Sequence, residues 1–300
     1  MSRASIASGG LAALAAVARA PFLLLPVALI ASGTGAAVHV GRARWAHAVL
    51  ALVGLLGAHV AVNTLNEASD FKSGIDLKTR RTPFSGGSGT LPAGLLDHRT
   101  VLRTGLAAGA IAIVIGVYFL IAVGSKLVPI LALGALAALA YTDFLARIYV
   151  GELFAGLGLG ALPVVGTALV QTGRYEPAAI AAAIPAFLMT FNLLLLNEFP
   201  DEDADREAGR RNLIILLDRR DATVVYLMCV ALVPVSLVSS VALGSLPRAA
   251  LLAALPSLAL MPAVRWGLST PDRPVPHAAL RSNVIWNLST NAVLAIALML

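Results

Sequence analysis

The chain has 300 residues, of which 58% are hydrophobic and only 13% are charged, and its mean hydropathy is +0.85. Soluble domains carry about 45–50% apolar and about 25% charged residues, so this composition excludes a soluble globular protein and indicates a helical membrane protein with several spans. The net charge of +6 predicts no nucleic-acid partner, because Lys and Arg in the loops of a protein in a lipid bilayer explain it more simply.

The chain has one cysteine, Cys229, and it lies within an apolar run. A single cysteine excludes a disulfide within the chain and disfavours a cysteine metal cluster. The first strong apolar run is followed by further apolar runs instead of a soluble domain. We therefore expect a retained first span and no cleaved signal peptide.

Nine apolar runs approach the length of about 20 residues that a membrane-spanning helix needs. They predict spans at residues 20–38, 45–65, 104–124, 127–142, 149–170, 176–197, 222–243, 247–267 and 283–300. The run at 127–142 is the shortest and lies close behind its predecessor. The expected fold is an all-α membrane protein, a bundle of nine transmembrane helices that forms a single domain over residues 1–300.

The distribution of basic residues predicts the orientation of these spans. If the N-terminus is cytoplasmic, all but five of the 22 Lys and Arg residues fall on the cytoplasmic side; the exceptions are Arg42, Arg44, Lys126, Arg174 and Arg248. Such an excess of cytoplasmic positive charge is the usual rule for membrane proteins. The sequence thus predicts a cytoplasmic N-terminus and, with nine spans, a C-terminus on the opposite side.

Two acid-rich stretches begin with the same pattern, Asn-Glu-x-x-Asp, and each stands at the predicted cytoplasmic end of an apolar run. The first covers residues 66–76 and continues to Lys78, Arg80 and Arg81; the second covers residues 197–206 and continues to Arg210 and Arg211. One acid–base loop alone is usually a solvated surface. The repetition of the pattern on one membrane face favours a shared function and an ancestral duplication of a helical unit.

The spacing within each stretch suits a metal-bound phosphate ligand. Asp201 and Asp205 are four residues apart, so on a helix they share one face with Asn197 one turn earlier, and Asn66 and Asp70 have the same spacing. Neighbouring carboxylates repel unless a cation lies between them, and Mg2+ binds carboxylates together with substrate phosphates. Arginine and lysine in both stretches would bind the phosphate oxygens. Together the stretches predict a Mg2+–diphosphate site.

Other polar residues and other functions carry less weight. Glu152 stands near the start of the run at 149–170 and is a functional candidate, because ionisable residues near the membrane are costly. A transporter is the first alternative, but its acids would be expected near the middle of the membrane and not at one face. A lipid-binding or scaffold protein would leave the paired acid motifs unexplained.

In these residues the chain resembles the UbiA superfamily of intramembrane prenyltransferases, whose motifs are Asn-Asp-x-x-Asp with a further Asp, and Asp-x-x-x-Asp. The corresponding stretches here are Asn66-Glu67-x-x-Asp70 with Asp76, and Asp201-x-x-x-Asp205. Residues 70–76, 86–92, 151–153 and 197–201 are similar to the branch that contains the 1,4-dihydroxy-2-naphthoate prenyltransferases of menaquinone synthesis. Glu67 departs from the family's usual Asp by one additional methylene group.

The resemblance implies a Mg2+-dependent transfer of a polyprenyl group from its diphosphate to a small aromatic acceptor, on the cytoplasmic side of the cell (inner or plasma) membrane. By matching positions, it implies that the metal–diphosphate ligands are Asn66, Asp70, Asp76, Asp201 and Asp205, of which the four aspartates are also catalytic. It implies that the substrate-binding residues are Asn66, Lys72, Arg80, Arg81, Asn197 and Arg210, and that Tyr141 is a catalytic ring that stabilises the allylic cation. A glycerophosphate or tetrapyrrole acceptor would need the same diphosphate site, so the acceptor stays open.

Overall fold

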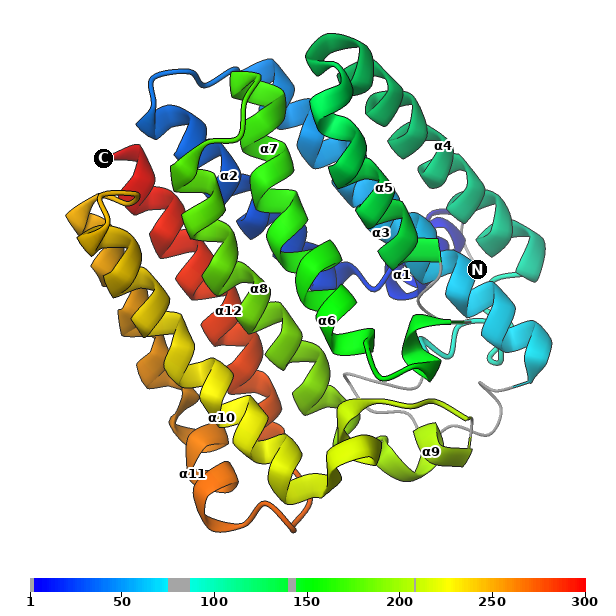
Figure 1. The fold of residues 1–300 in the computed structure, drawn as a ribbon. Coiled ribbons are helices and arrows are strands. Elements are labelled where there is room, and N and C mark those ends of the chain that lie inside the picture. The colour runs from blue at the N-terminus through cyan, green and yellow to red at the C-terminus, as the bar shows by residue number, and fades with distance from the viewer. Residues whose placement is uncertain (1–2, 75–86, 140–143, 208) are drawn as a thin grey trace. The chain divides into compact units, whose positions relative to one another are not determined.

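The computed structural model describes residues 3–74, 87–139, 144–207 and 209–300, and most of them are helical (Figure 1). Within these ranges the structure has no β-strand. The predicted all-α class is therefore confirmed. The chain divides into two compact units, of which the first contains Met1–Leu24 and Leu52–Tyr118 and the second contains Leu25–Ala51 and Phe119–Leu300.

The first unit is built from four elements. They are α1 (Arg3–Val17), the 3-10 helix η1 (Ala20–Leu23) and the greater parts of α3 (Trp45–Ser73) and α4 (His98–Val123). The Asn63 side chain on α3 donates a hydrogen bond of 3.0 Å to the carbonyl oxygen of Ala18, which fixes the segment after α1 to α3. A small apolar core joins α1, α3, α4 and the segment before α4 through Val17, Ala68, Leu91 and Val101.

The second unit contains the remaining elements. They are α2 (Leu24–His39), η3 (Ser125–Leu127), α5 (Val128–Leu139), η4 (Leu145–Arg147), α6 (Gly151–Gly156), the π-helix η5 (Leu157–Ala161), α7 (Leu162–Thr172), α8 (Pro177–Glu198), α9 (Glu202–Glu207), α10 (Leu213–Ala242), η6 (Arg248–Leu260), α11 (Met261–Ser269) and α12 (His277–Met299). The central helix is α8, which packs against α6, η5, α7, α10 and α12. In its most apolar stretch 61% of the residues are buried, against 22% in α10.

Neutral polar side chains connect the helices inside the second unit. Asn283 on α12 donates to the carbonyl oxygen of Asn192 on α8 at 3.1 Å, and it accepts a bond of 3.1 Å from the hydroxyl of Tyr226 on α10. Asn287 donates to the hydroxyl of Thr190 at 3.3 Å. Hydrogen bonds of this kind between helices stabilise bundles in membranes, where apolar burial against lipid contributes little.

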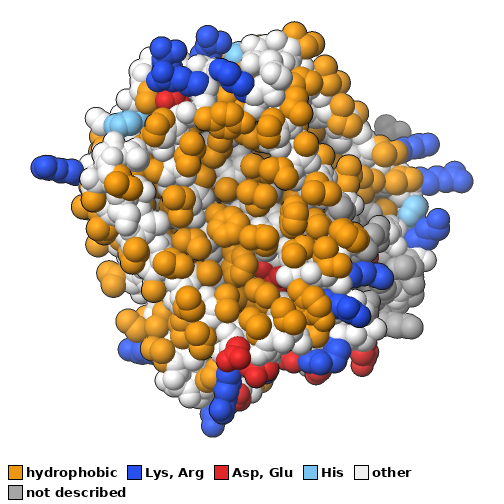
Figure 2. Space-filling view, viewed as in Figure 1, with side chains coloured by type: hydrophobic (Ala, Val, Ile, Leu, Met, Phe, Trp, Pro, Cys, Tyr) orange, Lys and Arg blue, Asp and Glu red, His pale blue; other side chains and the backbone are white. Residues whose placement is uncertain are grey.

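Eight of the helices in the described residues are long and apolar enough to cross a membrane. They are Ala20–His39, Trp45–Lys72, His98–Val123, Gly151–Thr172, Pro177–Glu198, Leu213–Ala242, Arg248–Ser269 and His277–Met299. The span expected at 127–142 corresponds to the shorter apolar helix Ser125–Leu139, which ends just before residues outside the described part. Figure 2 shows hydrophobic side chains over the middle of one face and most charged side chains toward its edges.

Two predicted span boundaries differ from the helix boundaries in the structure. The expected span at 45–65 continues as the helix α3 to Ser73, so Asn66 and Asp70 lie on one helix with the expected four-residue spacing. The span expected from 222 begins at Leu213, because the Asn212 side chain accepts the Ile215 N–H at 3.2 Å and caps the helix. Asp218 has φ 72° and ψ 171°, which breaks α10 near its start.

The contact between α2 and α7 gives a prediction for stability. A Cβ atom on Gly33 would lie 2.5 Å from the carbonyl oxygen of Val164 and 2.7 Å from the Cβ of Thr167. We expect Gly33→Ala to destabilise the fold by about 1–3 kcal/mol, because the two helix backbones would have to move apart. Thermal unfolding in detergent measures this effect. Gly134→Ala is the matched control, since nothing lies within 4 Å of the added atom, and equal midpoints for the two variants would contradict the prediction.

Candidate functional site

The second acid motif is placed by the end of α8. Asn197 and Glu198 end that helix, Pro200 follows, and a proline disfavours continuation of the helix through the residue before it. Asp201 lies in the turn, where its N–H donates to the Glu198 carbonyl oxygen at 3.1 Å, and the Asp205 N–H donates to the Asp201 carbonyl oxygen at 2.8 Å. Asp201 and Asp205 are thus one helical turn apart. Asn197 lies on the preceding helix, which corrects the expectation that all three share one helix.

Asp205 is buried, with 5% of its surface exposed. Its Oδ1 accepts a bond of 3.0 Å from Arg210 Nη1 and its Oδ2 accepts a bond of 3.0 Å from Asn212 Nδ2. Burial raises the pKa of the Asp205 carboxyl above its ordinary value; Arg210 opposes this rise and Asp201 adds to it. A divalent cation beside Asp205 would oppose this rise, because a nearby positive charge favours the ionised carboxylate.

The segment that holds Asp205 is itself fixed to the residues before α6. The Arg211 N–H donates to the Ala146 carbonyl oxygen at 2.8 Å, and the Arg211 carbonyl oxygen accepts the Tyr149 N–H at 2.9 Å. Glu152 on α6 accepts the Leu213 N–H at 2.6 Å. Residues 210–213 are consequently tied to η4 and α6 on one side and to Asp205 on the other.

Two further carboxyl groups are buried close to this segment. Glu152 is fully buried and Glu198 is 8% exposed. In each of them the Oε2 atom has no hydrogen-bond partner among the described residues. Glu198 interacts electrostatically with Glu152, Asp205 and Arg210. Glu152 was a sequence-predicted candidate, whereas the sequence gives no signal that Glu198 turns inward from the end of α8.

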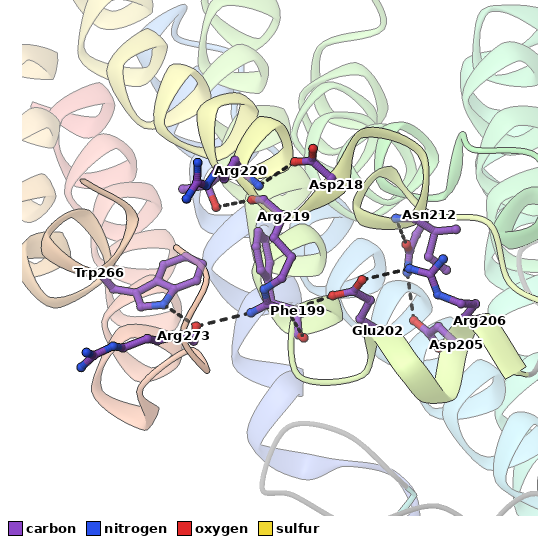
Figure 3. Close-up of polar contacts among 12 residues, drawn as sticks. Phe199, Glu202, Asp205, Arg206, Asn212, Asp218, Arg219, Arg220, Trp266 and Arg273 are labelled. Carbon is purple, nitrogen blue, oxygen red and sulfur yellow. Dashed lines mark hydrogen bonds and ion pairs between the residues drawn. The ribbon is translucent and has the colours of Figure 1, made fainter. Parts of the chain in front are cut away.

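Arg219 braces the turn between α8 and α9 (Figure 3). Its Nη1 donates to Glu202 Oε2 at 2.9 Å and to the Phe199 carbonyl oxygen at 3.2 Å, and its guanidinium lies 5.2 Å from the centre of the Phe199 ring. Its Nη2 donates to the Arg273 carbonyl oxygen at 3.4 Å. Trp266 packs edge-on against Phe199 at 5.0 Å. The start of α9 is thus joined to α10, α11 and the segment before α12.

Residues 66–73 of the first acid motif form the last turns of α3. Asn66 and Asp70 are half-buried there, and Lys72 is exposed. Glu67 is buried and its carboxylate accepts the backbone N–H of Ser88 at 3.1 Å and 2.9 Å. Four of the sequence-predicted site residues lie outside the described part of the chain: Asp76, Arg80, Arg81 and Tyr141.

The residues expected to hold a metal suit Mg2+ by their chemistry. Asn66, Asp70, Asp201 and Asp205 offer amide and carboxylate oxygens, which are the ligands that Mg2+ prefers. Asp201 adds to the rise in the pKa of the Asp205 carboxyl, and a cation bound beside both carboxylates would oppose that effect. Among the residues that the structure describes, no group of three or more His, Cys, Asp and Glu side chains is close enough to form a metal site. Asp76 is not among them.

Comparison with known proteins adds independent findings. The model of the family described as "UbiA prenyltransferase family" matches residues 23–288. The chain is 29% identical over 180 residues to the 1,4-dihydroxy-2-naphthoate octaprenyltransferase of Bacillus subtilis (strain 168), covering 57% of this chain and 55% of that protein. It is 30% identical over 179 residues to UbiA prenyltransferase domain-containing protein 1 of Mus musculus, covering 58% of this chain and 52% of that protein. The chain thus spans about half the length of these two curated relatives.

A longer match and two solved structures cover more of the chain. The 1,4-dihydroxy-2-naphthoate octaprenyltransferase of Mycobacterium leprae (strain TN) is 26% identical over 277 residues, covering 90% of this chain and 92% of that protein. A UbiA homolog from Archaeoglobus fulgidus bound to DMAPP and Mg2+ has a TM-score of 0.66 at 16% identity, covering 95% of this chain and 98% of that chain. A structure concerned with digeranylgeranylglyceryl phosphate synthase has a TM-score of 0.67 at 13% identity, covering 97% and 99%. At these identities the two structures show a shared fold.

The hydrogen bonds from Arg210 and Asn212 to Asp205, which we call the clamp, give a prediction for stability. Asn212→Ala removes a donor to the buried Asp205 carboxylate and also the cap of α10, so we expect a loss of about 1–3 kcal/mol in the free energy of unfolding. Asn212→Ser separates the two roles, because serine is a good helix cap but is too short to reach Asp205. Unfolding in detergent measures both variants, with Asp203→Ala on the exposed side of α9 as the control. Equal stability of Asn212→Ala and the control would contradict the clamp.

Proposed function

We propose, because the chain belongs to the UbiA prenyltransferase family, that this integral membrane protein transfers a polyprenyl group from its diphosphate to a small aromatic acceptor. The observation that carries the proposal is the buried Asp205 carboxylate, which Arg210 and Asn212 hold one helical turn from Asp201. Carboxylates arranged in this way are suited to a cation and a phosphate-rich ligand. We take residues 1–300 as one catalytic domain.

The diphosphate would be held by side chains of both acid motifs. Asn66, Asp70, Asp76, Asp201 and Asp205 are the proposed metal ligands, and when Mg2+ is bound it would neutralise the leaving diphosphate. Arg210 is partly exposed, with 44% of its side chain accessible. A guanidinium has five N–H donors, so Arg210 can bind Asp205 and a phosphate oxygen together. Lys72, Arg80, Arg81 and Asn197 are the further proposed substrate-binding residues.

The chemistry follows from a diphosphate leaving group and an electron-rich ring. The bond between the allylic carbon and the diphosphate oxygen breaks and releases diphosphate, and a ring carbon bonds to the allylic carbon. The ring then regains its aromaticity by losing the group that this carbon carried: a proton, which the released diphosphate or water accepts, or, in a dihydroxynaphthoate, the carboxylate as CO2. Tyr141 would stabilise the developing allylic cation through its ring face. Residues that bind the diphosphate and exclude water contribute most, because water would otherwise capture the cation.

The acceptor and the membrane side are inferred from different observations. The names of the Bacillus and Mycobacterium relatives favour a dihydroxynaphthoate acceptor and a step in menaquinone synthesis. All but five of the 22 Lys and Arg residues are predicted to fall on the side of the N-terminus. This excess favours a cytoplasmic N-terminus and a site that faces the cytoplasm. Within the second unit, the Arg44 N–H bonds to Gln171 at the end of α7, and α8 then runs its 22 residues, about 33 Å, to α9. Arg44, one of the few basic residues predicted to lie outside the cytoplasm, and Arg206 of α9 therefore lie at opposite ends of α8.

The role of the two motifs can be tested with purified protein in liposomes. We expect Asp70→Ala and Asp201→Ala each to lower prenyl transfer by at least about 100-fold, because each removes a ligand of the leaving group. Both variants should still insert into the membrane. Asp203→Ala, on the exposed side of α9, should retain full activity. Full activity in either motif variant would contradict the assignment of that carboxylate.

The acceptor can be identified with membranes that contain the protein, Mg2+ and a labelled prenyl diphosphate. We expect 1,4-dihydroxy-2-naphthoate to become labelled in preference to hydroxybenzoate, homogentisate, a glycerophosphate or a chlorophyllide. Labelling of the glycerophosphate or of a tetrapyrrole would assign a different acceptor class to the same diphosphate site. Uptake of a solute into proteoliposomes without any prenyl transfer would favour a transporter instead.

A further inference from the structure

Glu67 stands within the first acid motif, and its carboxylate is already occupied by hydrogen bonds. Only 2% of the residue is exposed. The backbone N–H of Ser88 donates to its Oε1 at 3.1 Å and to its Oε2 at 2.9 Å, and the hydroxyl of Ser88 donates to Oε1. None of the ion pairs found among the described residues involves Glu67. A buried carboxylate is stable when N–H and O–H groups donate to it in this way.

The backbone around Ser88 is shaped for this contact. Gly87 and Gly89 have φ values of 72° and 75°, a conformation that glycine adopts without steric cost. The bend between them directs both donors of Ser88 toward α3. The Ser88 hydroxyl donates its one proton to Glu67. The Ser88 Oγ atom therefore acts as the acceptor toward Thr90, whose hydroxyl lies 2.8 Å and whose N–H lies 3.1 Å from it.

Residues 88–98, which we call the strap, touch the same turn of α3 at further points. Leu91 is 4% exposed and belongs to the small core that contains Ala68. The Nε2 atom of His98 lies 3.2 Å from the Ala68 carbonyl oxygen. The ring of His98 lies 6.4 Å from the ring of Phe71. Ser88, Leu91 and His98 of the strap thus all contact residues 67–71.

The directions of the side chains on α3 separate two faces of this turn. With 100° per residue, Asn66 and Asp70 point about 40° apart, while Glu67 points about 100° and Phe71 about 140° from Asn66. Glu67 and Phe71 contact the strap. Asn66 and Asp70 lie on the adjoining side of the helix, where the motif has its remaining oxygen ligands.

We infer that Glu67 is a positioning residue that fixes the motif-bearing turn of α3 to the strap through Ser88, and that it is not a metal ligand. The statement that Asn66 and Asp70 meet the substrate rests on the proposed function; the contact between Glu67 and Ser88 does not. The inference also explains the departure from the usual Asp at this position. An aspartate is shorter by one methylene and would not reach Ser88 from the same backbone.

Two conservative variants give opposite results for a positioning residue and for a metal ligand. Glutamine keeps the length and can accept the Ser88 N–H while its amide donates to the hydroxyl, so E67Q should retain activity to within about threefold of the wild type. E67D should lose at least about tenfold, and neither variant should shift the Mg2+ concentration for half-maximal activity by more than about twofold. A metal ligand would tolerate E67D and fail in E67Q with a raised Mg2+ requirement. That reversed order would overturn the inference.

A second measurement does not depend on activity. Amide hydrogen exchange of a peptide covering residues 88–96 should be faster in E67D and in S88A than in the wild type, and E67Q should stay close to the wild type. The double variant E67D/S88A should exchange no faster than either single variant, because both remove the same contact. D70N, which lies outside the contact, should leave this peptide unchanged. Unchanged exchange in E67D and S88A would overturn the inference, even if prenyl transfer is found.

The two measurements distinguish this inference from the proposed function. If no acceptor is prenylated but the exchange follows the expected pattern, the proposed function fails and the link between Glu67 and the strap stands. If transfer is found and D70N abolishes it while E67D keeps both activity and slow exchange, the function stands and the positioning role fails.

Discussion

The burial of carboxylates at the ends of apolar helices is the constraint on which both motif regions depend. An ionised carboxylate in such a place is costly unless N–H and O–H groups or a cation surround it. Arg210 and Asn212 donate to Asp205, and the backbone N–H and the hydroxyl of Ser88 donate to Glu67. Glu67 is hydrogen-bonded to a residue 21 positions away and Asp205 to residues five and seven positions away, so each acid orders the connection that follows it.

The interior of the second unit follows a different rule. Along its helices neutral amides and hydroxyls, such as those of Asn283, Asn287 and Thr190, bond from helix to helix, whereas the buried carboxyl groups of Glu152 and Glu198 stand at helix ends. Asp205 and Arg210 lie just beyond the junction of α8 and α9, and Arg219 joins that junction to α10 and to the segment before α12. This separation suits a family whose substrates combine a polyanionic head with an apolar tail: the bundle can hold the tail while the motif end holds the charge.

Sequence reasoning captured what depends on composition and local spacing. The apolar runs located eight spans, and the repeated Asn-Glu-x-x-Asp pattern located both motifs. It placed the start of the span at residue 222, after the charged residues 218–221, whereas α10 begins at Leu213. It could not find the pairing of Glu67 with Ser88, which joins residues 21 positions apart, or the inward turn of Glu198. Such contacts depend on how the chain folds back on itself, which no local spacing records.

The break in α10 limits which residues can stand at position 218. Its backbone, with φ 72° and ψ 171°, lies in a region that is essentially restricted to glycine. Its side chain accepts the N–H of Arg220 at 2.8 Å and of Asp221 at 3.1 Å, which starts the helix again. Glycine would relieve the strain but would lose the acceptor oxygen. A larger apolar residue would keep the strain and would lose the acceptor as well. Position 218 should therefore tolerate few substitutions, although its side chain is exposed.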